Sequence, residues 1–162
     1  RAEVTVDCEN ALILASDILP GDATIAPEDA FSAAHAAFEL VRSRYIDRRT
    51  VGWPSFVADN AGFEASVVGD RIDPDRIGDV ISSVSVSADG GVRASGLIGE
   101  ELTDPFSSLA GLMAHAQERG LTLRKGEIVS AGAVARPFDI AGESTIVARY
   151  LESELCVQIR LP

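Results

Sequence analysis

Two acidic residues near the start of the sequence, Asp7 and Glu9, are separated by a single position. On a β-strand alternate side chains share one face, so these carboxylates would point the same way, about 7 Å apart. Burying both without a cation is costly, because like charges repel and neither remains hydrated. The apolar neighbours Val6, Ala11 and Leu12 indicate that this strand is not simply solvated. The pattern therefore predicts a site for a positive charge.

A third carboxylate, Glu39, follows where apolar residues recur at spacings of three and four. The spacing predicts an amphipathic helix from Pro27 to about Arg44. Its apolar face would be formed by Phe31, Ala34, Phe38, Val41 and Tyr45. Glu39 borders that face, where an acid usually needs a partner.

Three carboxylates meeting from a strand and a helix would offer oxygen ligands only, which suit Mg²⁺ or Mn²⁺. The alternative is that Asp7 and Glu9 lie on a solvated edge. Glu39 would then pair with Arg42 or Arg44. Spacing alone leaves both interpretations open, because D-x-E is a common pattern.

The rest of the sequence predicts the elements that must position these groups. A strand is expected over residues 4–16, a loop over 46–63, and a second helix from Asp104 to Arg119, which Gly120 would end. Further strands are expected over 65–69, 80–88, 92–98, 127–131, 144–151 and 154–161. The turn Asp89-Gly90-Gly91 favours a hairpin. Together these elements predict a β-rich α+β domain with about two helices.

The composition limits the possible partners. The chain has 162 residues, enough for one domain, and a net charge of −11 from 25 acidic and 14 basic residues. A surface with this negative charge repels phosphate backbones and anionic lipid, which argues against nucleic acid and membrane partners. Cys8 and Cys156 form no disulfide framework or zinc spacing, as expected for reduced thiols in a cytoplasmic protein. Lys125 is the only lysine.

Five motifs, in order, resemble one enzyme family. Residues 7–21 resemble the E-x-E-I-A-F-V-L-x-x-D-L-P-G stretch of the 2-hydroxypentadienoate hydratase and 4-oxalocrotonate decarboxylase family, a branch of the fumarylacetoacetate hydrolase fold. Residues 38–44 resemble I-E-L-V-D-S-R, and residues 57–60 match V-A-D-N. Residues 103–105 resemble the G-D-P before the second helix, and residues 123–132 resemble L-K-A-G-D-I-V-L-T-G.

The resemblance implies a metal site. The family's two E-x-E acids and the glutamate of I-E-L-V-D-S-R bind Mg²⁺ or Mn²⁺, and they correspond here to Asp7, Glu9 and Glu39. Ser130 and Gly132 resemble a strand end that lines the site. The resemblance also implies a strongly curved, mixed, barrel-like β-structure with helices outside it, and assembly into a homo-oligomer or with a partner subunit.

Three departures from the family pattern bear on this inference. The first glutamate is Asp7 here, one methylene shorter, and the aspartate of V-D-S-R is Arg42. Family members also carry a segment before E-x-E that supplies a catalytic lysine, and Lys125 is not its counterpart. We therefore expect residues 1–162 to form a single catalytic-type domain that lacks this segment.

The expected function is that of a metal-dependent lyase, a hydratase or decarboxylase, acting on small anionic 2-oxo or 2-hydroxydienoic acids of aromatic catabolism. A 2-oxo acid can chelate a metal that polarises its keto group. The alternatives are a non-catalytic subunit of the same fold and a C–C bond hydrolase.

Four further residues are candidates for catalysis. His35 could act as a base or orient Glu39, or be a boundary histidine. Arg44 could bind the substrate carboxylate in a bidentate manner, or interact with the dipole of its helix. Asp59 and Asn60 could order a loop at the site, or simply form an Asx-type turn.

Overall fold

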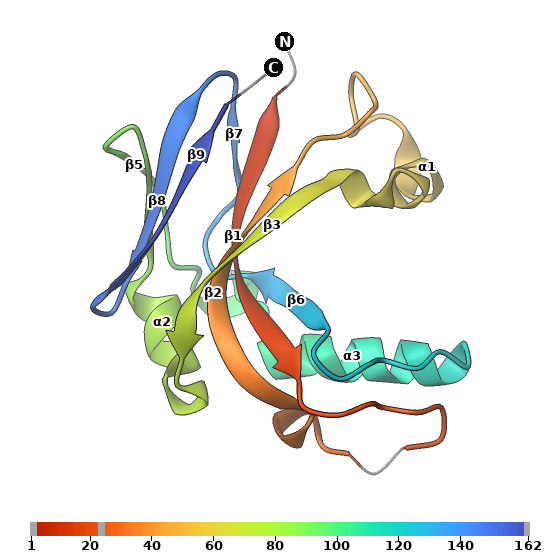
Figure 1. Cartoon of the computed structure of the whole chain (residues 1–162). Coiled ribbons are helices and arrows are strands. Elements are labelled where there is room, and N and C mark those ends of the chain that lie inside the picture. The colour runs from red at the N-terminus through yellow and green to blue at the C-terminus, as the bar shows by residue number, and fades with distance from the viewer. Residues whose placement is uncertain (1–2, 23–24, 161–162) are drawn as a thin grey trace.

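Two antiparallel β-sheets form the framework of the computed structural model, which describes residues 3–22 and 25–160 (Figure 1). The first sheet has the order β3-β2-β1-β6, and β7 also pairs with β1. Its strands are β1 (Val4–Leu14), β2 (Phe31–Val41), β3 (Phe63–Ile72), β6 (Ile128–Ala133) and β7 (Phe138–Ile140). The second sheet has the order β5-β4-β8-β9. Its strands are β4 (Ser85–Ala88), β5 (Gly91–Ser95), β8 (Ser144–Tyr150) and β9 (Ser153–Ile159).

Three α-helices accompany these sheets: α1 (Gly52–Ala58), α2 (Ile77–Ser83) and α3 (Pro105–Glu118). The predicted β-rich α+β class is therefore confirmed. The strand pairs of the described residues are all antiparallel, not mixed, and the two sheets are separate. No helix in the described ranges is long and apolar enough to cross a membrane.

The main correction concerns residues 27–44, for which a helix was predicted. Only Pro27–Asp29 forms a short 3-10 turn, and Phe31–Val41 is the strand β2. Its residues pair one by one with β1, from Val41 opposite Thr5 to Ala33 opposite Ile13. The buried residues Ala34, Ala36 and Phe38 keep a period of two, so the helical spacing was accidental.

Smaller differences from the predicted elements concern short helices and strands. The predicted strand 80–88 divides into α2 and β4, and the predicted loop 46–63 contains α1. β7 has three residues and was not predicted. The predicted strand 154–161 corresponds to β9, and its end at Leu161 lies outside the described residues.

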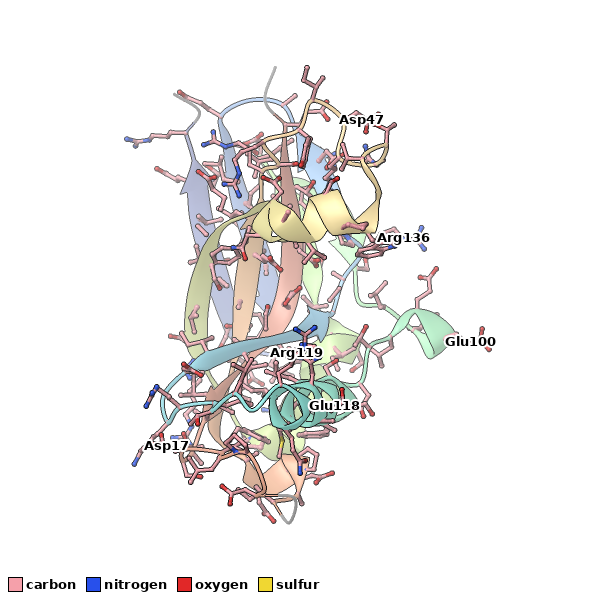
Figure 2. All side chains as sticks on the ribbon, turned by 90° about the vertical axis from the view of Figure 1, so that its right-hand side faces the viewer. Asp17, Asp47, Glu100, Glu118, Arg119 and Arg136 are labelled. Atoms are coloured by element: carbon pink, nitrogen blue, oxygen red, sulfur yellow. The ribbon has the colours of Figure 1, made fainter. Side chains whose placement is uncertain are left out.

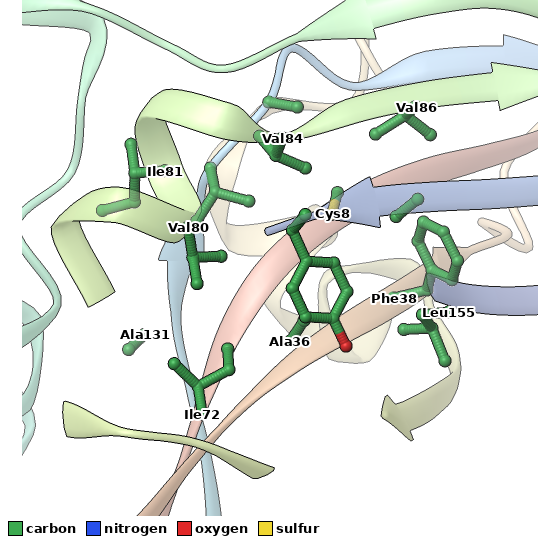
Figure 3. Packing of buried hydrophobic residues seen from close by; sticks show 14 of the residues in the cluster. Cys8, Ala36, Phe38, Ile72, Val80, Ile81, Val84, Val86, Ala131 and Leu155 are labelled. Carbon is green, nitrogen blue, oxygen red and sulfur yellow. The ribbon is translucent and has the colours of Figure 1, made fainter. Parts of the chain in front are cut away.

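The hydrophobic core fills the space between the two sheets. β1 contributes its even-numbered side chains, among them Cys8 and Leu12, which pack with Phe38 of β2. Tyr150 of the second sheet belongs to this core. Leu155 of the second sheet and Val80 and Ile81 of α2 also pack into it (Figure 3). Because alternate residues of a strand face opposite ways, the odd-numbered side chains of β1 point away from this core.

The helix α3 begins as the sequence predicts. The Asp104 side chain accepts hydrogen bonds from the backbone N–H groups of Phe106 and Ser107, at 3.3 and 3.0 Å. α3 contacts β6 through its inner side, where Leu109 is fully buried. β6 is thereby held beside β1, with Ser130 opposite Ala11.

Candidate metal centre

Asp7, Glu9 and Glu39 lie on one face of the first sheet, the face directed away from the core. Asp7 of β1 is the direct cross-strand partner of Glu39 of β2, and Glu9 is opposite Ala37. Side chains directly opposite each other in an antiparallel pair have Cβ atoms about 5 Å apart. The three carboxylates therefore lie on neighbouring strands of one sheet, instead of on a strand and a helix.

Glu9 is the most enclosed member of the group, with 7% of its surface exposed. The Ser130 hydroxyl of β6 donates a hydrogen bond to its carboxylate. Burial raises the pKa of Glu9, and the charges of Asp7 and Glu39 add to the rise. The backbone N–H of Gly132 and a hydrogen bond with the Glu39 side chain also act on this carboxyl group, the first lowering its pKa and the second raising it.

Asp7 carries an unsatisfied oxygen. Its Oδ1 is buried and has no hydrogen-bond partner among the described residues. Burial raises the pKa of Asp7 to about 7, with a further rise from the Glu39 charge and an opposing effect of Arg48. A buried carboxylate oxygen without a partner is costly unless a proton or a cation satisfies it.

Carboxylate oxygens are the ligand type that a hard divalent cation prefers, and one of these oxygens lacks a partner among the described residues. In the described ranges, no three His, Cys, Asp or Glu side chains are already arranged as a set that could hold an ion. The three carboxylates thus share a face and interact, but their oxygens do not yet enclose a common point.

The alternative arrangement from the sequence is not seen. β1 is a central strand with partners on both sides, so Asp7 and Glu9 are not on an edge. Arg42 instead pairs with Glu64 at 2.8 Å. Arg44 pairs with Asp59, as described next.

Arg44 and Asp59 form a closely bonded pair that orders the segment after β2. The Arg44 Nε donates to Asp59 Oδ1 at 2.5 Å, and its Nη2 donates to the Asp59 carbonyl at 2.8 Å. The Ser43 hydroxyl donates to Asp59 Oδ2 at 2.6 Å, and this bond contributes most to a lowered Asp59 pKa. Asp59 thus links the segment after β2 to the end of α1. Asn60 follows with a φ of 54° and an exposed side chain.

His35 lies farther from Glu39 than a helix would place it. On a helix, residues four apart are about 6 Å apart, whereas four residues of strand span roughly 13 Å. Its Nδ1 is 2.9 Å from the Gly69 carbonyl oxygen, which this nitrogen can reach as a donor. A role in orienting Glu39 therefore loses its geometric basis, although His35 shares the carboxylate face.

Two residues that the sequence analysis did not single out, Thr5 and Arg48, also reach this face. Thr5 is two residues before Asp7 on β1, and its hydroxyl donates to Asp139 Oδ1 at 2.5 Å. Arg48 Nη2 donates to the Thr5 Oγ1 at 2.8 Å. The period of two could have indicated Thr5, but no local pattern indicates that Arg48 folds back onto β1.

A cavity of about 380 Å³ lies between the start of β1 and the segment after β2, and Asp7, Glu9 and Glu39 are not among the residues that line it. It is lined by Glu3, Thr5, Asp139 and residues 41–49. Figure 2 views the molecule from the side of α1, with this segment at the top near Asp47 and with β6 and α3 below it. The lining is strongly charged, because it includes Arg42, Arg44, Arg48 and Arg49.

Comparison with solved structures identifies the fold, whereas comparison with sequences finds no match. No family model matches the sequence, and no curated protein matches it. Among solved structures, 4-oxalocrotonate decarboxylase from Pseudomonas putida G7, complexed with magnesium and adipate, is 23% identical with a TM-score of 0.76. That match covers 98% of this chain and 60% of the decarboxylase chain.

Two further structures have the same fold at lower similarity. Fumarylpyruvate hydrolase from Pseudomonas aeruginosa, in complex with Mn²⁺ and pyruvate, is 15% identical with a TM-score of 0.63, over 99% of this chain and 67% of that one. A fumarylacetoacetate hydrolase family protein from Yersinia pestis CO92 is 14% identical with a TM-score of 0.64, over 98% and 70%. The chain therefore has the fold of the fumarylacetoacetate hydrolase family and spans about 60% of the length of the decarboxylase that it matches.

Proposed function

We propose that this chain binds Mg²⁺ or Mn²⁺ through Asp7, Glu9 and Glu39 and takes part in a metal-dependent lyase reaction on a small 2-oxo acid. The observation that carries the proposal is the buried, unpartnered Oδ1 of Asp7, directly across the strand pair from Glu39 and beside Glu9. Three carboxylates on one sheet face are stable together only if protons or a cation offset their charge.

The residues around the carboxylates have supporting roles in this proposal. Ser130 and the Gly132 N–H hold the Glu9 carboxylate in place, as groups that bond to metal ligands commonly do. Asp59 positions Ser43 and Arg44, and Arg44 remains a candidate for binding the substrate carboxylate. Asn60 ends this ordered segment, and His35 is the remaining candidate base on the carboxylate face. A bound divalent cation would supply Lewis-acid polarisation of the 2-oxo group.

Among the candidate reactions, similarity to the solved structures supports decarboxylation ahead of C–C bond hydrolysis, and hydration rests on the sequence resemblance alone. The decarboxylase with bound magnesium has a TM-score of 0.76 to this chain, against 0.63 for the fumarylpyruvate hydrolase with bound Mn²⁺ and pyruvate. Because the chain also resembles the fumarylpyruvate hydrolase, C–C bond hydrolysis is a second candidate reaction. The chain spans only part of the length of each relative, so a non-catalytic binding role is a third outcome to be tested.

Metal binding is tested first, by thermal unfolding and calorimetry with Mg²⁺ and Mn²⁺. A ligand at 100 times its Kd stabilises a folded protein by about 2.7 kcal/mol. For a domain of this size, that corresponds to a rise in Tm of roughly 5–10 °C. The variants D7N, E9Q and E39Q should each abolish most of this rise. Glu118→Gln, an exposed acid on α3, is the matched control and should leave it unchanged.

The reaction is tested second, with metal-loaded protein. Release of CO₂ from a vinylogous 2-oxo diacid would identify a decarboxylase, addition of water to a 2-hydroxydienoate a hydratase, and cleavage of an acylpyruvate a hydrolase. Metal and acid binding without turnover would identify a binding subunit. No shift in Tm with either cation at millimolar concentration would overturn the proposal as a whole.

A further inference from the structure

A bulge in β6 gives the Glu9 carboxylate one of its hydrogen-bond donors. Two residues of β6, against one of β1, lie between the pairs made by Glu9 and Ala11. The extra residue of a bulge is left out of the ladder, so its N–H is free to bond elsewhere. Gly132 lies in this bulge with a φ of 109°, and its N–H bonds to Glu9. The position of this donor therefore depends on what holds the bulge in place.

The side chain of Thr103 occupies the space beside Gly132. A Cβ atom at residue 132 would lie 2.7 Å from the Thr103 Cγ2 and 2.9 Å from its Cβ, which is closer than carbon atoms can pack. The Thr103 Oγ1 is farther away, at 3.4 Å from the same point. Thr103 therefore covers the Cα of Gly132 mainly through its carbon atoms, and only a glycine leaves room for this approach.

The segment that carries Thr103 is itself held at both ends. At one end, the side chain of Asp104 caps α3 and accepts hydrogen bonds from two backbone N–H groups, at 3.3 and 3.0 Å. At the other end, the Leu97 N–H donates to the Val134 carbonyl, just after the bulge, at 2.9 Å. Figure 2 shows this segment, with Glu100 labelled, leading into α3. Thr103 is therefore a fixed point against which the bulge can pack.

This contact is a departure from the motif that the segment resembles. The G-D-P motif matched by residues 103–105 has a glycine where this chain has Thr103. A glycine at this position would leave the Cα of Gly132 uncovered and would add backbone freedom just before α3. The threonine thus gives this chain a restraint on the bulge that the motif does not contain.

We propose that Thr103 is a positioning residue for the metal centre: its side chain fixes the bulge at Gly132, and the bulge holds the N–H donor on the Glu9 carboxylate. This inference rests on the proposed function, in which Glu9 is a metal ligand, and adds a residue that acts on Glu9 through Gly132. A donor that is fixed in advance reduces the ordering that the ligand must undergo when a cation binds. Loss of the contact should therefore lower metal affinity.

The test follows the Gly132 amide and the affinity for Mn²⁺ in the variant T103G. Exchange of the Gly132 N–H, measured by NMR on metal-free protein, should become at least about fivefold faster. The Val134 N–H, which donates to the Cys8 carbonyl at 2.8 Å, is the internal control and should keep its exchange rate. The Kd for Mn²⁺, measured by electron paramagnetic resonance, should rise about three- to tenfold, less than for loss of a group that bonds to a ligand directly.

Three more variants separate packing from hydrogen bonding. T103V keeps the branched shape without the hydroxyl, and both values should stay within about twofold of wild type. T103S removes the methyl group whose carbon lies closest to Gly132, so it should fall between wild type and T103G. T122G, the matched control, removes a threonine from the loop after α3 and should leave both values unchanged.

Unchanged exchange of the Gly132 amide in T103G would overturn this inference. An equal acceleration at Val134 would do the same, because it would show a general loosening of the fold. Faster exchange with an unchanged Kd for Mn²⁺ would remove the role in metal binding, and an equal loss in T103V would assign the effect to the hydroxyl. Failure of the wild-type protein to bind Mn²⁺ would overturn the proposed function, whereas exchange in the metal-free protein would still decide whether Thr103 positions the donor.

Discussion

Asp7 and Glu39 are direct partners across the antiparallel pair of β1 and β2, although 32 positions separate them in the sequence. Like charges in this arrangement destabilise a sheet, and burial adds to the cost. The sheet retains the pair on its central strands, next to the enclosed carboxyl of Glu9. Such an arrangement is expected where charge has a use beyond stability.

Replacing Asp7 by asparagine should stabilise the metal-free protein and weaken metal binding. D7N removes one of the repelling charges while keeping the shape of the side chain. We expect Tm without metal to rise by a few degrees at pH 8, since about 1 kcal/mol corresponds to roughly 2–4 °C for a domain of this size. The rise in Tm on adding Mn²⁺ should be largely lost. Thermal unfolding with and without Mn²⁺ measures the Tm of the metal-free protein and its rise on metal binding, with E118Q as the control. A D7N protein that is less stable than wild type at pH 8 would contradict the expectation.

The stability of the metal-free protein should depend on pH through Asp7. Its pKa is raised from 3.8 to about 7 by burial and by the Glu39 charge, so the folded state binds a proton that the unfolded state releases. The stabilising contribution is fully present below the unfolded pKa and is lost as pH rises through about 7. Urea unfolding at pH 5 and pH 8 measures the change.

D7N is the reference for that experiment, because other groups also titrate. The free energy of unfolding should fall more from pH 5 to pH 8 in wild type than in D7N. Metal binding should have the opposite pH dependence, since a cation competes with the protons on Asp7 and Glu9 and should bind more tightly at pH 8. Equal pH profiles for the two proteins would show that Asp7 is not protonated in the folded state.

Removing the hydroxyl of Ser130 should weaken metal binding without unfolding the protein. The Ser130 hydroxyl donates to the Glu9 carboxylate from an exposed position on β6. Loss of a group that orients a metal ligand typically lowers affinity about 10- to 100-fold. We expect an effect at the lower end for S130A, because the Gly132 N–H still contacts Glu9. Calorimetry measures the Kd for Mn²⁺, with Ser95→Ala on β5 as the control. An unchanged Kd in S130A would exclude a role of Ser130 in orienting Glu9.

Replacing Asp59 by asparagine should loosen the segment that carries the arginines. The Asp59 carboxylate accepts hydrogen bonds from the Ser43 hydroxyl, from the backbone N–H of Arg44 and from the Arg44 guanidinium. An asparagine cannot offer two charged acceptor oxygens, so D59N should show faster amide exchange over residues 42–49 and a lower Tm. Hydrogen exchange measured by mass spectrometry tests this, with Asp75→Asn, an exposed acid, as the control.

The D59N experiment also tests whether the ordered segment takes part in acid binding. If the ordered segment matters for acid binding, affinity for 2-oxo acids should fall while Mn²⁺ affinity stays near that of wild type. Unchanged exchange in D59N would show that the backbone alone orders the segment.

Several local features were predictable from the sequence because nearby residues determine them. The period of two placed Asp7 and Glu9 on one face of a strand, and the Asp104 cap defined where α3 begins. The five ordered motifs indicated the fold that the solved structures later showed. For Asp59 the sequence left open whether it orders a loop at the site or forms an Asx-type turn, and only the structure shows its bonds to Ser43 and Arg44.

Tertiary structure decided where the third carboxylate and the arginines lie. Residues 31–41 carry apolar side chains that suit a helix or a strand equally, and only pairing with β1 selects the strand and sets Glu39 opposite Asp7. Arg48 reaches Thr5 across 43 positions, a contact that no local pattern encodes. The physical reason is that side-chain direction follows from local backbone geometry, whereas the meeting of distant charges depends on strand register and loop packing.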